Sequence, residues 1–453
     1  MFHHRAEAIN KFLISWKFEP VVISSIGVFL LLLLATAYEP AIVSAFLAML
    51  IALSPIWLPL YLAVIFWIVW IDYIRFLFWF SQDTVLLEVQ LPQEVAKNPG
   101  AMEVFLTSFW NAAGEGTMIN RAWKGSYRPI WSLEIASNEG RIGFYIHMRK
   151  GFRNVIEARL YGQFPEAKIT EVDDYAARIP FNLTDYELFG AEYVKGSPEA
   201  LPIKTYIDYG LDKDPKEELK IDPLSQILEL IGQVGINEHY WIQIILKPRR
   251  NESEWYAIRN SSDDVYQKKG KEAIEKIIKG AADRIASVSG DKEAGKQAIT
   301  RGVGLLTQAE RERVERIEGA MSKLVFEVGM RTLYLAKKQN FNPTNIAGMI
   351  RLFDPFRGQN SDLYNQINPT RGTTIFDYPW QDFRDIRKRI IKKNMFFQYK
   401  NRAYFYVPYD QVPMFMNVEE LATIWHFPSS VIQTPGLNRV PSRRSEAPVN
   451  LPI

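Results

Sequence analysis

The architecture follows from two apolar stretches near the N-terminus: VVISSIGVFLLLLLATA at residues 21–37 and AIVSAFLAMLIALSPIWLPLYLAVIFWIVWI at residues 41–71. Neither stretch contains a charged residue, and only Tyr38-Glu39-Pro40 separates them. A helix needs ~20 apolar residues to cross the ~30 Å hydrocarbon layer of a bilayer. Residues 1–80 are therefore predicted to form a membrane anchor of two, or three, hydrophobic helices. A cleaved signal peptide is a weaker alternative, because its apolar region is far shorter and no small-x-small cleavage site follows before Trp79. A buried core hairpin is also weaker, because soluble cores rarely extend for thirty residues without a charge.

Charged residues around the anchor predict its orientation. Arg5, Lys11 and Lys17 precede the first stretch and Arg75 follows the second, whereas the connector carries no positive charge. Positive residues stay on the cytoplasmic side of a membrane. We therefore expect a multi-pass protein of the cytoplasmic (inner) membrane, with both termini and the soluble domain in the cytoplasm.

Pro55 and Pro59 interrupt the second apolar stretch. They either kink one long helix or divide it into a short span and an interfacial helix. Tryptophans and charged residues near the stretch suit the headgroup boundary. The predicted anchor residues are Trp57, Trp67, Trp70, Asp72 and Arg75.

Composition limits what the remaining residues can do. The chain has 453 residues, which allows two or three domains beyond the anchor. Its 54 Lys and Arg against 51 Asp and Glu give a net charge of +3, which is no overall nucleic-acid signature. The absence of cysteine excludes disulfides, thiolate metal sites and cysteine nucleophiles.

Residues 84–175 contain six predicted elements in the order β-α-β-β-α-β. Asn98-Pro99 is a typical helix start, and the turn Asn138-Glu139-Gly140 joins two alternating strands into a hairpin. Pro165 ends the second helix, and a short strand follows at Lys168 to Val172. This order is that of the ferredoxin-like split βαβ sandwich.

The same order is predicted a second time downstream. A strand at Ile203 to Tyr209 precedes a helix that begins at Asp222-Pro223, and strands follow at 240–247 and 324–336. A helix from Asn342-Pro343 and a weak strand at 373–376 complete the unit. The predicted fold class is α+β: a transmembrane helical hairpin, then two tandem ferredoxin-like units at residues 81–180 and 181–380. One irregular α+β domain is the alternative.

The second unit contains a charged insertion at residues 249–320. Residues 271–285 and 307–321 have helical patterns with opposite charges at i,i+4 spacing. A solvated helical arm is the preferred interpretation, and a partner-docking helix pair is the alternative. Gly290 to Gln297 matches a phosphate-binding loop, but Gln replaces Ser or Thr and no predicted strand precedes it. We interpret it as a chance match, so nucleotide hydrolysis here is the least favoured function.

No catalytic, cofactor-binding or metal-binding residue is predicted. The five histidines, including His147, lack ligand spacing. Asp173-Asp174 is interpreted as a pair of solvated loop charges. A basic cluster follows Trp380 on a predicted helix and is a candidate contact for polyanions or lipid headgroups, although a solvated helix face is the alternative. The cluster comprises Arg384, Arg387, Lys388, Arg389, Lys392 and Lys393.

The C-terminal region, residues 381–453, carries a family resemblance. NVEELATIWHFP at residues 417–428 predicts a capped helix over 417–427 with Asn417 and Glu420 in a capping box, and a Pro-rich tail follows. Further stretches are AMEVFL (101–106), RIGFYI (141–146), ARLYGQFPEA (158–167), WIQIILKP (241–248) and FEVGMR (326–331). Together they resemble the membrane-anchored N-terminal region of bacterial type IV secretory conjugative DNA-transfer ATPases of the coupling-protein type.

The resemblance implies a membrane-bound scaffold without a motor domain, because the chain stops at Ile453, where the motor of that family begins. The motor is then either a separate chain or the continuation of a longer protein of which this sequence is a fragment. No catalytic residue of that family can be carried over. We expect a non-catalytic scaffold or adjunct of a DNA-translocation or type IV secretion-like ATPase, with a separate motor or secretion subunit as partner. A membrane-tethered nucleic-acid-binding module is the alternative, and self-association remains open. The candidate partner-docking residues are Asn417, Glu420, Leu421, Trp425, Phe427 and Pro428.

Overall fold

The computed structural model describes residues 40–92, 98–111, 117–213, 221–249, 265–289, 306–358, 362–370, 372–373, 382–406, 411–428, 436–437 and 439–440. The chain forms two compact units. Unit 1 contains residues 1–82, 114–127 and 405–411, and unit 2 contains residues 83–113, 128–404 and 412–453. The predicted first crossing at 21–37, the loop at 290–297 and the proline-rich residues of the tail after 440 lie outside the described residues.

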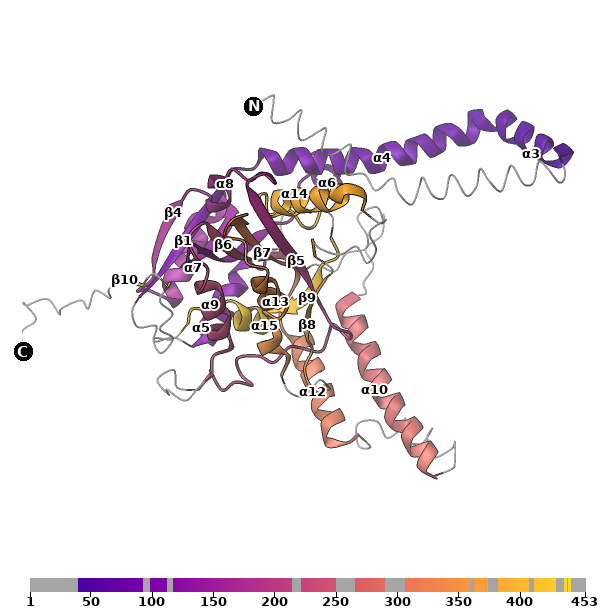
Figure 1. Ribbon diagram of the computed structural model, residues 1–453. Coiled ribbons are helices and arrows are strands. Elements are labelled where there is room, and N and C mark those ends of the chain that lie inside the picture. The colour runs from indigo at the N-terminus through magenta and orange to yellow at the C-terminus, as the bar shows by residue number, and fades with distance from the viewer. Residues whose placement is uncertain are drawn as a thin grey trace, which may run out of the picture. The chain divides into compact units, whose positions relative to one another are not determined.

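The described residues of unit 1 form two apolar helices and one short helix. They are α3 (Pro40–Ala52), α4 (Ser54–Ser81) and α6 (Met118–Ala122) (Figure 1). Pro55 lies in the first turn of α4, where its missing N–H costs nothing, and Pro59 lies inside the helix. Among the described helices, α4 alone is long and apolar enough to cross a membrane. The prolines thus accompany a division of the second apolar stretch into a short and a long helix.

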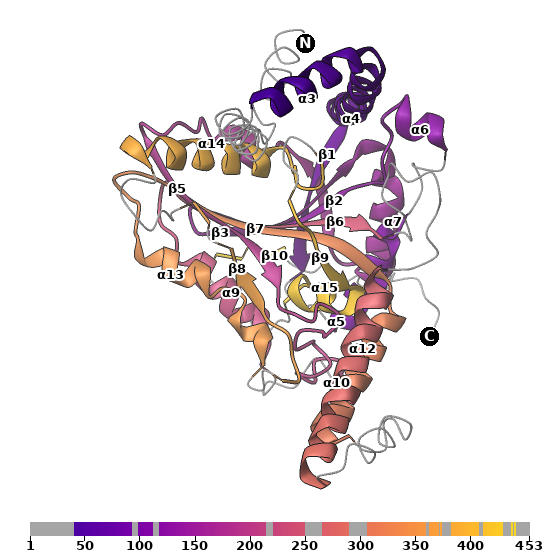
Figure 2. The same ribbon diagram turned by 90° about the vertical axis from the view of Figure 1, so that its right-hand side faces the viewer.

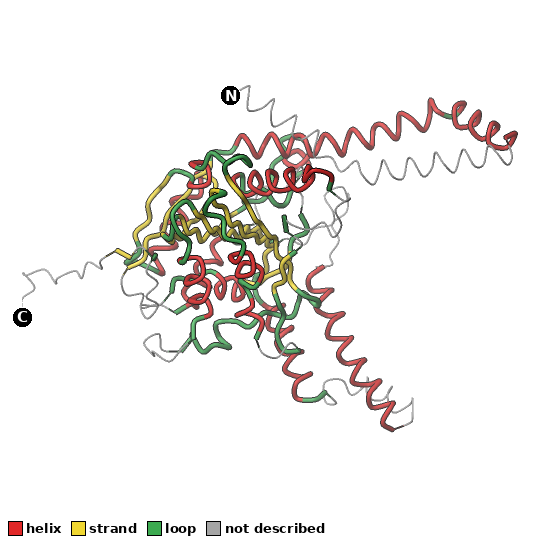
Figure 3. Tube along the Cα trace, in the orientation of Figure 1, coloured by secondary structure: helices red, strands yellow, loops and turns green. Residues whose placement is uncertain are grey.

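Unit 2 contains one large antiparallel sheet. Among the described residues, nine strands pair antiparallel, and β10 (Arg439–Val440) adds a short parallel pair to β1. The strands are β1 (Thr84–Pro92), β2 (Trp131–Asn138), β3 (Arg141–Arg149), β4 (Lys168–Val172), β5 (Tyr186–Lys195), β6 (Glu238–Pro248), β7 (Val325–Lys337), β8 (Ile367–Pro369) and β9 (Met414–Asn417). The order is β4-β1-β3-β2-β6-β7-β5-β8, with β9 also paired to β7. Figure 3 shows the strands gathered together, with helices around them.

The two halves of this sheet repeat one element order. The first half runs β1-α5-β2-β3-α7-β4 and the second runs β5-α9-β6-β7-α13-β8. The helices are α5 (Pro99–Leu106), α7 (Arg153–Gln163), α9 (Pro223–Gly232) and α13 (Thr344–Ile350). In each half the strands lie in the order fourth, first, third, second. The second strands β2 and β6 pair from Trp131↔Leu246 to Asn138↔His239, so both halves share one sheet.

Two predicted strands of the second half are wrong. Residues 203–209 form a loop and a turn, and the first strand is β5 instead. Because β5 lies between two strands and is largely buried, it lacks the polar alternation that marks a half-exposed strand. The last strand is β8, whereas Thr373 lies in a turn and residues 374–376 lie outside the described residues.

Helices cover both faces of the sheet (Figure 2). Helices α5, α7, α9, α13 and α15 (Val418–Ile424) share a core with one face. Helices α14 (Ile386–Lys400) and α8 (Tyr175–Arg178) pack on the other face. The charged insertion forms α10 (Val265–Ser289) and α12 (Gln308–Ser322), which lie side by side as an arm. The base of the arm is not fully solvated, because Tyr266 and Ile317 are buried against Leu201.

Candidate functional site

The predicted basic cluster lies in the first half of α14, with Arg384 in the short turn just before the helix. Four of its side chains are exposed and Lys388 is half-buried. Lys392 differs, because it is buried and its amino group pairs with Glu187 on β5. Lys392 is therefore part of the interior, and its assignment to a surface contact is wrong. The exposed members are Arg384, Arg387, Arg389 and Lys393.

The same surface of α14 also carries apolar side chains. Ile386 and Ile390, one turn apart, are 48% and 52% exposed, and Ile391 is 36% exposed. A helix face that combines isoleucine with Arg and Lys is typical of contact with an anionic, partly apolar surface. These isoleucines were absent from the sequence prediction, although their i,i+4 spacing beside the basic residues was a usable signal.

The inner face of α14 is aromatic. Tyr399 stacks on Trp241 of β6 with ring centroids 5.1 Å apart, and Phe396 stacks on Phe181 at 4.3 Å. These side chains form the core of this face of the sheet together with Met395. The packing holds α14 in place, so that its basic and apolar surface points away from the sheet.

A buried cluster of charges lies beneath the end of α14. Arg402 donates from Nε and Nη2 to the two carboxylate oxygens of Glu134 on β2, at 2.9 and 3.1 Å, and it also pairs with Asp174. Gln243 of β6 and Tyr175 of α8 donate to Glu134 at 3.0 and 2.7 Å. Both oxygens of Glu134 thus have several donors, as a buried carboxylate requires. Asp174 is an ion-pair partner and not a solvated loop charge.

Electrostatics indicates that this cluster is structural. Burial alone raises the pKa of Glu134, but the Arg402 guanidinium outweighs it and lowers the pKa to about 2. Burial, and then the charge of Arg402, lowers the pKa of His147 to about 3. At neutral pH Glu134 is ionised and His147 is neutral, so neither of them exchanges a proton near pH 7. A general acid or base requires a pKa close to the working pH.

The predicted capping box in the C-terminal region is present. Asn417 accepts from the Glu420 N–H at 2.9 Å, and the Asn417 N–H donates to Glu420 Oε2 at 3.0 Å. Glu420 also pairs with the buried Lys195 at 2.7 Å. Helix α15 ends at Ile424, three residues before the predicted end.

The interpretation of this region as a partner-docking tail is wrong. Leu421 and Trp425 are 0% exposed, and Asn417, Glu420, Phe427 and Pro428 are also buried. Trp425 and Phe427 pack against Phe144 of β3, with ring centroids 6.0 and 5.8 Å apart. These side chains fill the core of unit 2, so a partner cannot reach them while the sheet is folded.

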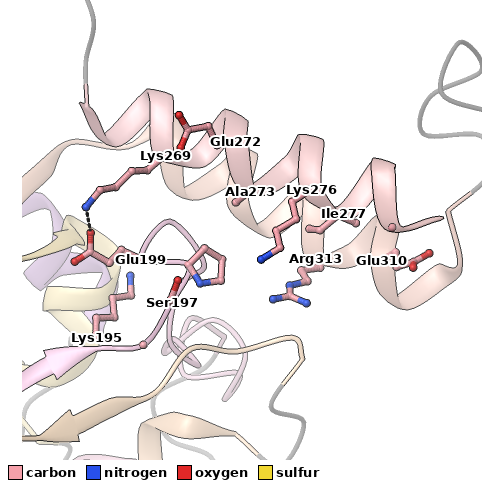
Figure 4. A pocket seen from close by; sticks show the side chains of 13 residues that line it. Lys195, Ser197, Glu199, Lys269, Glu272, Ala273, Lys276, Ile277, Glu310 and Arg313 are labelled. Atoms are coloured by element: carbon pink, nitrogen blue, oxygen red, sulfur yellow. Dashed lines mark hydrogen bonds and ion pairs between the residues drawn. The ribbon is translucent and has the colours of Figure 1, made fainter. Parts of the chain in front are cut away.

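A cavity of about 820 Å³ lies between the arm and the loop after β5 (Figure 4). Lys269 pairs with Glu199 at 2.8 Å at one end, and Lys276 and Arg313 point into the open part. The Arg313 Nε is buried and has no hydrogen-bond partner among the described residues. Carboxylates of Glu272 and Glu310 also line the cavity, so its charge is mixed.

The predicted anchor residues lie in two parts of α4, one near its start and one nearer its end. Trp57 is 43% exposed near its start, and its indole donates to the Leu50 carbonyl at 2.9 Å. Trp67, Trp70, Asp72 and Arg75 are half-buried nearer its end. Within the part of the chain that the structure describes, no group of three His, Cys, Asp or Glu could hold a metal ion.

These features define an α+β sheet domain that follows an apolar helix and carries a basic helix on its surface. The chain belongs to the family described as "Domain of unknown function (DUF8128)", whose model matches residues 83–439. The match begins directly after α4 and includes the whole sheet through the first residue of β10. A comparison with curated proteins gives no match.

Proposed function

We propose that this protein is a non-catalytic scaffold of the cytoplasmic membrane that serves a separate DNA-translocation or type IV secretion-like motor ATPase. Its anchor crosses the membrane more than once, with a further span at residues 21–37, and the sheet domain faces the cytoplasm. Each half of the sheet is a ferredoxin-like unit. The strand order β4-β1-β3-β2 and its repetition in β8-β5-β7-β6 support this last point.

The exposed apolar surface of α4 carries the proposal. Its large side chains from Ile56 to Ile68 are mostly exposed; Leu60, for example, is 66% exposed. Water is a poor solvent for such a surface, whereas lipid chains would cover it. Strand β1 begins at Thr84, only a few residues after α4 ends at Ser81, so the sheet domain is tethered close to the membrane. The family resemblance of the sequence supports the choice of partner.

Two measurements test the proposal with the full chain. Alkaline extraction of membranes should leave the protein in the pellet, and its presence in the soluble fraction would refute the tether. Affinity purification after cross-linking in native membranes should then enrich a P-loop ATPase. Repeated purification without any such ATPase would refute the scaffold role and leave the tether intact.

A membrane-tethered nucleic-acid-binding module is the second candidate, supported by the exposed arginines of α14. Replacing Arg384, Arg387, Arg389 and Lys393 with Gln should then abolish salt-dependent binding of single-stranded DNA. A matched control replaces four arm residues with the same loss of charge. The control residues are Lys268, Lys271, Lys276 and Lys279. Equal binding by both variants would refute a specific role for α14.

A further inference from the structure

The environment of α4 changes abruptly along its length. Large apolar side chains are exposed up to Ile68, which is 42% exposed. From Ile71 to Trp79 the side chains are buried or half-buried, and Ile71, Ile74 and Phe76 are only 2%, 7% and 4% exposed; Phe80, near the end of α4, is 48% exposed. The change falls at Trp70, one of the residues predicted to lie at a membrane boundary.

Residues 117–127, distant in sequence but part of the same unit, pack against α4 at this level. The Trp70 indole donates to the Ala122 carbonyl at 2.8 Å, and the rings of Trp70 and Trp123 meet edge-on at 5.9 Å. Gly125 approaches the α4 backbone so closely that a Cβ atom there would lie 2.3 Å from the Ile74 carbonyl oxygen. Residues 117–127 are therefore held at one fixed position along α4.

The outer side of this segment is apolar. Met118, Ile119 and Trp123 are 63%, 61% and 63% exposed. Arg121 and Lys124 stand between and beside them in the sequence. Thr117 caps α6 by accepting from the Asn120 N–H at 3.2 Å, so the helix begins at Met118 and presents this residue outward. Three adjacent large apolar side chains with two cations match the composition of helices that lie in a bilayer interface.

We propose that α6 and Trp123 lie in the headgroup region of the bilayer as a second, non-spanning membrane contact at the level of Trp70. The inference rests on the proposed tether through α4. Indoles favour the boundary between water and lipid, and Trp70 lies where the exposed apolar surface of α4 ends. Met118, Ile119 and Trp123 then insert beneath the headgroups, and Arg121 and Lys124 contact anionic lipids. This contact sets how deep α4 lies in the membrane.

Site-directed spin labelling tests the inference, and the absence of cysteine makes single labels straightforward. Full-length Ile119→Cys, Met118→Cys, Leu62→Cys and Ile236→Cys variants are labelled in vesicles of phosphatidylcholine and phosphatidylglycerol. Collisions with oxygen report lipid, and collisions with a water-soluble nickel chelate report water. Ile236, 72% exposed in unit 2, is the aqueous control, and Leu62, 53% exposed on α4, is the lipid control.

We expect the labels at 118 and 119 to be more accessible to oxygen than to nickel and shallower than the label at 62. Water-accessible labels at 118 and 119, with the label at 62 in lipid, would overturn the inference and leave the tether intact. Labels at 118 and 119 that neither reagent reaches would show that protein covers α6, which also overturns it. A water-accessible label at 62 would refute the tether itself.

Discussion

The two halves of the sheet share one strand order but differ at one connection. In the first half, Glu139 and Gly140 alone join β2 to β3. In the second half, the arm with α10 and α12 stands between β6 and β7. The β6–β7 ladder is nevertheless continuous from Glu238↔Ala336 to Pro248↔Phe326. The buried faces of the strands therefore hold the register of a hairpin even where a long insertion replaces its turn.

The two halves meet at the buried charge cluster. Glu134 lies on β2 of the first half and Gln243 on β6 of the second, and both contact this cluster, in which Arg402, just after α14, binds Glu134. We call the pairing of β2 with β6, together with Glu134, Gln243 and Arg402, the seam. The pairing of β2 with β6 joins the backbones, and the cluster joins the side chains. If the halves are one cooperative body, the largest stability effects should come from this seam.

Arg402→Met should destabilise unit 2 by ~3–5 kcal/mol, because it leaves Glu134 as a buried charge without its cation. Urea unfolding of the full chain in detergent, followed by tryptophan fluorescence, measures the change. Arg178→Met is the matched control, since Arg178 pairs with Asp173 at 3.5 Å and both side chains are exposed; we expect less than ~1 kcal/mol. Glu134→Leu combined with Arg402→Met should recover much of the loss. Equal effects of the two arginine substitutions would show that the seam does not hold the halves together.

The seam should also make the fold sensitive to acid. The pKa of Glu134 is lowered from 4.5 to about 2, so its stabilising effect is complete above pH 4.5 and is lost as the pH falls toward 2. The pKa of His147 is lowered from 6.5 to about 3, so the unfolded chain gains a proton first as the pH falls below 6.5. The free energy of unfolding should therefore decrease from pH 6.5 downward. His147→Gln should flatten the part between pH 6.5 and 4.5, and an unchanged slope there would contradict the assignment.

His426 should change the free energy of unfolding with pH in the opposite direction to His147. Burial lowers the pKa of His426, but Asp222, 3.1 Å away, outweighs burial and raises it. Its stabilising effect is present below pH 6.5 and is lost as the pH rises through the pKa of the folded state. His426→Gln should remove a loss of stability on the alkaline side and leave the acidic slope unchanged.

A smaller loss of stability should result from a substitution in the short turn between β2 and β3, the connection that the second half replaces with the arm. Glu139 and Gly140 have φ angles of 53° and 82°, and a side chain at Gly140 would meet the Val234 carbonyl oxygen at 3.0 Å. Gly140→Ala should cost about 1–2 kcal/mol. Gly151→Ala is the control, because a Cβ there has nothing within 4 Å. A negligible cost at Gly140 would mean that this turn, like the arm, contributes little to the register.

The sequence predicts features that depend on neighbouring residues, such as turns and helix caps, and it does not predict contacts between residues far apart in the chain. The hairpin turn, the Asn417–Glu420 capping box and β4 follow from local patterns, and the structure confirms them. Strand β5 was missed because burial on both faces removes the alternation. The seam was missed because Glu134 and Arg402 are 268 residues apart, so Glu134 resembles any outward position of an exposed strand. For the same reason the sequence alone does not show that residues 417–428 are buried, and it predicts a docking segment there.

The smallest change in stability is expected for a substitution in the arm, and it tests whether the arm contributes to the stability of the sheet. Arg284 of α10 pairs with Glu310 of α12 at 2.7 and 2.9 Å, but the arginine side chain is 46% exposed. Arg284→Gln should leave the free energy of unfolding almost unchanged, because exposed pairs are strongly screened by solvent. Hydrogen exchange should become faster at amides near Arg284 and Glu310 and stay unchanged in β6 and β7. If protection of β6 and β7 were lost, the arm would be supporting the hairpin from which it emerges, and the register would depend on the insertion after all.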